Sequence, residues 1–167
     1  MNWRHGVRLI GLVLILAGLA GCKEQRVAIG APAPALAAFD LGGQPAGLEQ
    51  WRGKPVYLTF WSSDCGGCAA DMHTLQQLTD AYGDRLVVVA VNTDPQQTDL
   101  TAFIAGLHIR YPVVRDQMGI TKERYAVIGT PTSYLLNPQG RVVEIHQGLR
   151  GEAALTAMFK QAQQDKS

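Results

Sequence analysis

Trp61-Ser62-Ser63-Asp64-Cys65-Gly66-Gly67-Cys68 is the stretch that decides the fold. An apolar run over 56–61 leads into it, and a helix-like segment over 69–82 follows it. We therefore expect the two cysteines where a strand ends and a helix begins, with Cys65 first in the helix. There the free main-chain amides and the positive end of the helix dipole lower the pKa of a thiol. Because a thiolate is the form that attacks disulfides, this turn predicts a nucleophile and a second thiol that resolves the mixed disulfide.

Trp61-x3-Cys65-x2-Cys68 behind a buried strand resembles the thioredoxin superfamily, and within it the bacterial thiol-disulfide oxidoreductases of the TlpA/ResA type. Phe60-Trp61, Asp71-Met72 and Gly129-Thr130-Pro131-Thr132 support the resemblance, which spans roughly Ala33 to the C-terminus. It implies an α/β fold, a thioredoxin-like three-layer sandwich with an N-terminal β-hairpin and a central insertion.

The resemblance also implies roles for single residues. Cys65 attacks a protein disulfide and Cys68 resolves the mixed disulfide. Pro131 matches the cis-proline that lies beside the dithiol and shapes the docking groove. Thr130 offers main-chain groups that can pair with a substrate chain, and Trp61 joins these two as a substrate-binding residue.

Asp71 occupies a position where TlpA/ResA-type proteins often carry glutamate, and its implied role is to exchange a proton with Cys68. Helical spacing can bring it to the same face as Cys68, three residues earlier. The alternative is a first-turn aspartate that only favours the helix dipole. Thioredoxins usually place a buried acid on the preceding strand, but here Thr59 stands there.

Other interpretations of the cysteine pair stay open. It could be half of a zinc site, but no second pair exists, and His73, His108 and His146 do not repeat at ligand spacing. It could be a structural disulfide, but so short a loop removes little unfolded-chain entropy.

The N-terminus resembles that of a bacterial lipoprotein. Two arginines precede an apolar core over 9–19, and Leu19-Ala20-Gly21-Cys22 resembles a lipobox. The predicted organisation is a signal peptide over 1–21, lipidated Cys22 and a tether over 22–34, and a thioredoxin-like domain over 35–167. The alternatives are an uncleaved anchor, and a tether whose last residues cover the domain. Either anchor places the domain outside the cytoplasm, where disulfides persist.

Hydrophobic periodicity and turn signals predict the remaining elements. They are a hairpin of 36–41 with 44–48, strands 56–61 and 86–91, a helix over 96–107 capped by Thr93 or Asp94, an extended piece over 111–114, a short helix within 116–125, a hairpin of 132–136 with 141–146, and a closing helix over 151–163. On the first helix, Met72 and Leu75 form a core stripe, whereas His73, Gln76 and Gln77 are expected on a solvated face.

These patterns predict a membrane-tethered, periplasm-facing thiol-disulfide oxidoreductase that reduces protein disulfides, as in cytochrome c maturation or metal-centre assembly. No organic cofactor or metal is required, and we expect a monomer with a membrane thiol-disulfide electron donor. The net charge of +1 gives no reason to expect nucleic acid. No His or Lys separates the thiols, which argues against a strong oxidant. Lys23 resembles an outer-membrane sorting signal, but such reductases often meet donors at the inner membrane. Which of the two membranes holds the lipid anchor is therefore left open.

Two other functions remain as alternatives. A Cu(I)-binding assembly protein would use the two thiolates, with Met72 or His73 nearby. A peroxiredoxin-like peroxidase is the weaker alternative, because peroxiredoxins usually carry a Thr-x-x-Cys motif with an earlier proline, whereas this chain has Ser62 three positions before Cys65 and lacks that proline.

Overall fold

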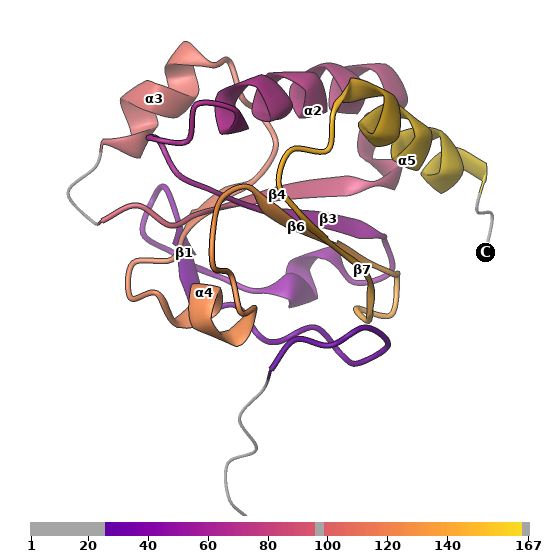
Figure 1. Cartoon of the computed structure of the whole chain (residues 1–167), viewed down its shortest axis with the longest axis horizontal. Coiled ribbons are helices and arrows are strands. Elements are labelled where there is room, and N and C mark those ends of the chain that lie inside the picture. Colours follow the sequence, from indigo (N-terminus) through magenta and orange to yellow (C-terminus); the bar gives the residue numbers. More distant parts are fainter. Residues whose placement is uncertain (1–25, 96–98, 165–167) are drawn as a thin grey trace, which may run out of the picture.

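A computed structural model describes residues 26–95 and 99–164 (Figure 1). The predicted signal peptide and Cys22 lie outside the described residues, and so does the start of the predicted helix over 96–107. In the described part of the chain, no helix is long and apolar enough to cross a membrane.

A seven-stranded mixed sheet forms the centre of the molecule, in the order β2-β1-β5-β4-β3-β6-β7. The strands are β1 (Ala38–Asp40), β2 (Pro45–Ala46), β3 (Val56–Trp61), β4 (Val87–Asn92), β5 (Val113–Arg115), β6 (Thr132–Leu136) and β7 (Val142–Gln147). β3 pairs with parallel β4 on one side and antiparallel β6 on the other. All six of its residues are buried because both faces of the sheet are covered.

Helices cover the two faces unequally (Figure 1). The helices are α2 (Cys68–Tyr82), α3 (Leu100–Gly106), α4 (Ile120–Arg124) and α5 (Glu152–Gln164), with 3-10 turns η1 (Leu48–Trp51) and η2 (Gly83–Arg85). α2 and α5 lie side by side on one face, with α3 beside them, and α4 and η1 lie on the other. The predicted three-layer α/β sandwich is confirmed.

The alternation of side chains along β3 divides the core into two parts. Tyr57 and Trp61 point to the face covered by α2, α3 and α5, where they pack with Met72 and Leu75. Val56, Leu58 and Phe60 point to the opposite face, where they pack with Tyr125 and Tyr134. One strand therefore contributes to both cores and ends directly at the cysteine turn.

The boundaries of several elements differ from the predictions. The N-terminal hairpin has strands of only three and two residues. The described part of the predicted 96–107 helix is helical only from Leu100, and its N-cap is Asp99, whose side chain accepts from the Ala102 amide at 3.2 Å. The predicted caps Thr93 and Asp94 are wrong, because both are used at the end of β4, as described below. Gln76, expected on the solvated face, is buried and accepts from the Arg110 amide.

The described end of the predicted tether is bound to the domain. The Val27 amide donates to Arg124, and Gly30 and Ala33 donate to the β6–β7 hairpin at 2.7 and 2.8 Å. Chain attachment therefore starts before residue 35, in agreement with the alternative that the last tether residues cover the domain.

Candidate active site

The cysteine pair forms a disulfide, with Cα atoms 5.4 Å apart. The prediction that Cys65 is first in the helix is wrong, because α2 begins at Cys68 with Gly67 as its N-cap. Cys65 lies one turn earlier: its amide donates to Ser62, and its carbonyl accepts from the Cys68 amide at 3.0 Å. Its sulfur is nevertheless bonded to the first helical residue, so the helix dipole still acts on it.

The two sulfur-bearing residues differ in access. Cys65 is half-buried at the surface, whereas Cys68, the first residue of α2, is 2% exposed and packs in the core. A protein partner can therefore reach Cys65 more readily than Cys68. This asymmetry supports the assignment of Cys65 as the attacking thiol and Cys68 as the resolving thiol, which stays a prediction.

The turn before Cys65 is held by a buried carboxylate. Asp94 is 6% exposed, and both of its oxygens accept from the Ser63 amide, at 3.1 and 3.0 Å. One of them also accepts from Asn92 Nδ2 at 3.0 Å, while the Thr93 amide donates to Trp61 at 2.9 Å. Sequence reasoning missed this role. The available signal was the position of Asp94 after β4, because neighbouring parallel strands end at the same edge of a sheet.

The Thr130–Pro131 bond is cis, as the resemblance implied. Thr130 Oγ1 lies 3.0 Å from Ser62 Oγ, so a hydrogen bond links the cis-proline loop to the cysteine turn. The Pro131 carbonyl accepts from Gly148 at 2.8 Å. Thr130 and Pro131 are both half-buried, so part of each residue is open to an approaching chain.

Trp61 does not share that position. It is 1% exposed and its ring stacks on Phe103 of α3, with centroids 5.4 Å apart. A side chain so deeply buried cannot contact a protein substrate in this conformation, so the prediction that Trp61 binds substrate needs correction. Trp61 instead supports the cysteine turn from within the core, where Cys65 packs against the same cluster.

Asp71 is half-buried on the first turns of α2, one turn after Cys68. Its Oδ2 accepts a hydrogen bond of 3.3 Å from the Arg150 amide in the loop between β7 and α5. One oxygen of the partly exposed carboxylate is therefore tied to that loop. Its position suits a proton exchange with Cys68, which stays a prediction.

The two side chains considered for copper lie in different environments. Met72 is 1% exposed in the core, whereas His73 is exposed and lies 3.1 Å from the Gln77 side chain. Within residues 26–95 and 99–164, no group of three or more His, Cys, Asp or Glu side chains is placed to hold a metal ion.

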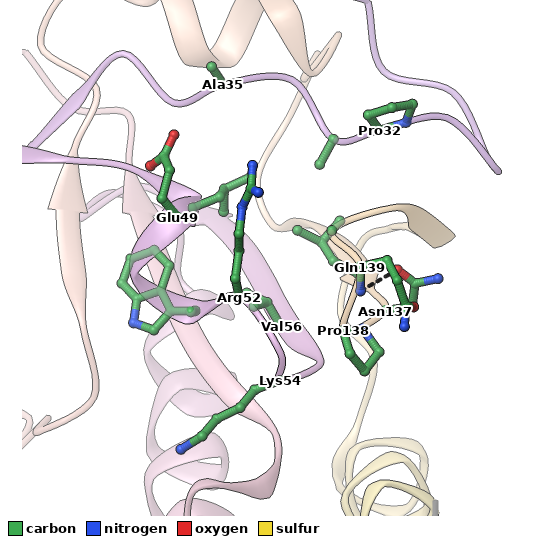
Figure 2. Close-up of a pocket in the computed structure, with 14 residues that line it drawn as sticks. Pro32, Ala35, Glu49, Arg52, Lys54, Val56, Asn137, Pro138 and Gln139 are labelled. Atoms are coloured by element: carbon green, nitrogen blue, oxygen red, sulfur yellow. Dashed lines mark hydrogen bonds between the residues drawn. The ribbon is translucent and has the colours of Figure 1, made fainter. Parts of the chain in front are cut away.

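A cavity of about 280 Å³ lies at the far end of β3 (Figure 2). Its walls come from residues 32–35, η1, the residues that lead into β3 and the β6–β7 turn, and they include Glu49, Arg52 and Lys54. Lys54 forms an ion pair with Asp84. The cavity borders Val56, the first residue of β3, whereas the disulfide follows its last, so it does not belong to the dithiol site.

A thioredoxin-like sandwich with a Cys-x-x-Cys disulfide at the start of a helix and a cis-proline beside it defines a thiol-disulfide oxidoreductase. The chain belongs to the AhpC/TSA family, whose model matches residues 29–145.

Known proteins of similar sequence and structure agree with this class. The thioredoxin-like protein YneN of Bacillus subtilis is 31% identical over 158 residues, which cover 88% of this chain and 90% of the relative. The thiol-disulfide oxidoreductase ResA of Bacillus cereus is 29% identical over 158 residues, with 89% and 91% covered.

Solved structures show the same likeness. A putative thiol:disulfide interchange protein DsbE from Chlorobium tepidum has a TM-score of 0.72 and 33% identity, over 83% of this chain and 96% of that one. An exposed lipoprotein thioredoxin from Streptococcus pneumoniae has a TM-score of 0.64 and 26% identity, over 77% and 99%.

Proposed function

We propose that this protein reduces disulfides of other proteins outside the cytoplasm, from a lipid anchor at Cys22. The observation that carries the proposal is the exposure difference between Cys65 and Cys68 beside the cis-proline loop. The accessible thiol can form a mixed disulfide with a large partner, and the buried thiol can then resolve that mixed disulfide and release the partner.

The reaction proceeds in two exchange steps. The Cys65 thiolate attacks one sulfur of a substrate disulfide, and the other substrate sulfur leaves as a thiolate that takes a proton. Cys68 then attacks the Cys65 sulfur, which re-forms the disulfide seen here and releases the second substrate thiol. Two electrons pass from the enzyme dithiol to the substrate disulfide, so a thiol donor must reduce the enzyme again.

Asp71 is the proposed proton acceptor for Cys68. A buried thiol is a poor nucleophile until it loses its proton, and Cys68 is 2% exposed. The Asp71 carboxylate lies one helical turn away, on the side where it accepts from Arg150.

The proposed direction of electron transfer, from the enzyme dithiol to the substrate disulfide, rests on the residues near the thiols. The two residues between Cys65 and Cys68 are glycines, so no cation stands between the thiols to stabilise the reduced form strongly. We expect a reduction potential closer to the ~−270 mV of thioredoxin than to the ~−120 mV of the oxidant DsbA. Equilibration in glutathione or dithiothreitol redox buffers measures it, and a value near the oxidant end would overturn the reductase direction.

The lipid anchor has its own test. Cys22→Ser should release the folded domain from membranes or leave an unprocessed precursor, with exchange activity intact. Mass spectrometry and membrane fractionation measure both, and unchanged mass with unchanged membrane association would rule out the lipobox. The solved lipoprotein thioredoxin from Streptococcus pneumoniae supports this arrangement by analogy.

The proposed substrates are proteins of cytochrome c maturation or metal-centre assembly, reached through the groove beside Pro131. Pro131→Thr should alter the floor of that groove and prolong mixed disulfides while both thiols are present. Non-reducing gels of captured complexes followed by mass spectrometry would identify the substrates. Complexes no longer-lived than those of the native protein would remove Pro131 from the proposed groove.

A further inference from the structure

The loop of residues 148–151 between β7 and α5 touches the start of α2 at two points. The side chain of Leu149 packs on Gly67, within the cysteine turn. The amide of Arg150 donates to Asp71 Oδ2 at 3.3 Å. Two consecutive residues of one loop therefore hold both ends of the segment that carries Cys68.

Arg150 is unusual because its charge is buried. Its side chain is 9% exposed, and one guanidinium nitrogen donates to Glu144 Oε1 at 2.8 Å. The guanidinium carbon lies 5.7 Å from the centroid of the Tyr57 ring. Among the described residues, Nε finds no hydrogen-bond partner although it is buried. Burying a cation is costly unless negative charge compensates it, and among the described residues the only ion-pair partner of Arg150 is the half-exposed Glu144.

Arg150 contacts groups from three elements: Asp71 of α2 accepts from its amide, Glu144 of β7 accepts from its guanidinium, and the Tyr57 ring of β3 lies against that guanidinium. Tyr57 in turn interacts with Ser133 of β6 and with Tyr111, in the segment before β5. Burial raises the pKa of Tyr57, Ser133 and Arg150 offset part of the rise, and Asp71 adds to it. Burial also raises the pKa of Tyr111, and Asp71 contributes. Arg150 and Asp71 therefore both act on Tyr57, which is buried in the core that also contains Cys68.

We propose that Arg150 is a positioning residue for the resolving step: its amide orients Asp71, and its guanidinium stabilises the negative charge that passes between Asp71 and Cys68. The inference rests on the proposed proton transfer to Asp71. In that step the Cys68 proton moves to the carboxylate and the Cys68 sulfur bonds to Cys65. The bond between Cys65 and the substrate sulfur breaks, and the electron pair leaves with the substrate thiolate, which takes a proton from water.

The test separates attack from resolution. Full-length protein carrying Cys22→Ser, so that only the two site thiols remain of the three cysteines, is reduced and mixed with Ellman's reagent in a stopped-flow instrument. The first coloured thiolate reports attack by Cys65, and the second, concentration-independent release reports resolution by Cys68. This Cys22→Ser protein, with all other side chains native, gives the reference rates. If it shows no second release, that result refutes the exchange mechanism itself and not the role of Arg150.

Arg150→Met keeps the apolar stem and removes the charge. It should leave the first phase unchanged and shift the pH midpoint of the second phase upward by about one unit, which makes resolution about tenfold slower below the midpoint. Arg150→Lys should restore most of the rate. Adding Asp71→Asn to Arg150→Met should slow resolution no more than Asp71→Asn alone, because the two act as one unit.

Arg110→Met is the matched control, since Arg110 is exposed and pairs with Asp80 on the surface of α2; both phases should stay unchanged. If Arg150→Met does not fold, Arg150→Gln carries the same expectation. Equal slowing of both phases, additive effects with Asp71→Asn, or an unshifted pH profile would show a merely structural role and overturn the proposal.

Discussion

Leu149 packs directly on Gly67, the residue that precedes Cys68. A Cβ at Gly67 would lie 2.7 Å from Leu149 Cδ1 and 3.1 Å from its Cγ. The backbone of Gly67 has φ −87° and ψ −22°, which any residue can adopt. The glycine is therefore favoured by its neighbour and not by its own conformation.

Gly67→Ala should consequently destabilise the oxidised protein relative to Gly66→Ala. Both substitutions reduce the freedom of the unfolded chain equally, but a Cβ at Gly66 meets nothing within 4 Å. We expect a difference of about 1 kcal/mol, at the low end of overpacking costs, because Leu149 is 55% exposed and can turn into solvent. Urea unfolding measures it. In a Leu149→Ala background the difference should vanish, and its persistence would contradict this origin.

Cys65 and Cys68 should separate cleanly by mutation. Cys68→Ser should trap substrate proteins as mixed disulfides through Cys65, because no thiol remains to resolve them. Cys65→Ser should trap none and lose exchange activity, because the remaining thiol is 2% exposed. In the reduced protein, iodoacetamide followed by peptide mass mapping should modify Cys65 first. Faster alkylation of Cys68, or activity in Cys65→Ser, would reverse the roles.

Asp94→Ala should loosen the turn that carries Cys65. The substitution leaves the Ser63 amide and Asn92 Nδ2 without their acceptor, which costs about 1–3 kcal/mol for buried groups. Asp94→Asn retains one acceptor oxygen and should cost less. Denaturant unfolding measures the stabilities, and the rate at which Cys65 is alkylated in the reduced protein reports whether the turn has loosened. Equal stability of the alanine variant and the native protein would mean that water replaces the carboxylate.

High pH should destabilise the fold through its buried tyrosines. Burial raises the pKa of Tyr134 from 10.0 to about 12, and it also raises the pKa values of Tyr57, Tyr111 and Tyr125. The folded state therefore holds phenol protons that the unfolded state releases. This stability is fully present below pH 10 and is lost as the pH rises through the folded values, at roughly 1.4 kcal/mol per pH unit for each tyrosine.

Thermal melts between pH 9 and about 12, with phenolate absorbance recorded in parallel, test this expectation. Tyr134→Phe keeps the ring in contact with Phe60 and Tyr125 but removes one ionising group, so its stability should fall less steeply with pH. If these four phenols ionise near pH 10 while the protein stays folded, the burial effect is absent.

Sequence alone determined the elements whose signals are local. The apolar run before Cys65, the helical stripe after Cys68 and the turn over 137–140 each predict their structure from neighbouring residues, and all three are present. The cysteine pair and Pro131 could be predicted as site residues because their spacing and flanking residues resemble those of a known family.

Only the tertiary structure decided which distant groups meet at the site. Asp94 reaches Ser63, Leu149 covers Gly67 and Arg150 holds Asp71 across separations of 31 or more residues. No local pattern encodes these contacts, because they follow from strand order and from where the β7–α5 loop descends onto α2. Helix packing likewise places Trp61 in the core, whereas the resemblance led us to expect it in the substrate groove. Periodicity gives the face of a strand, but the burial of that face depends on the helices that cover it.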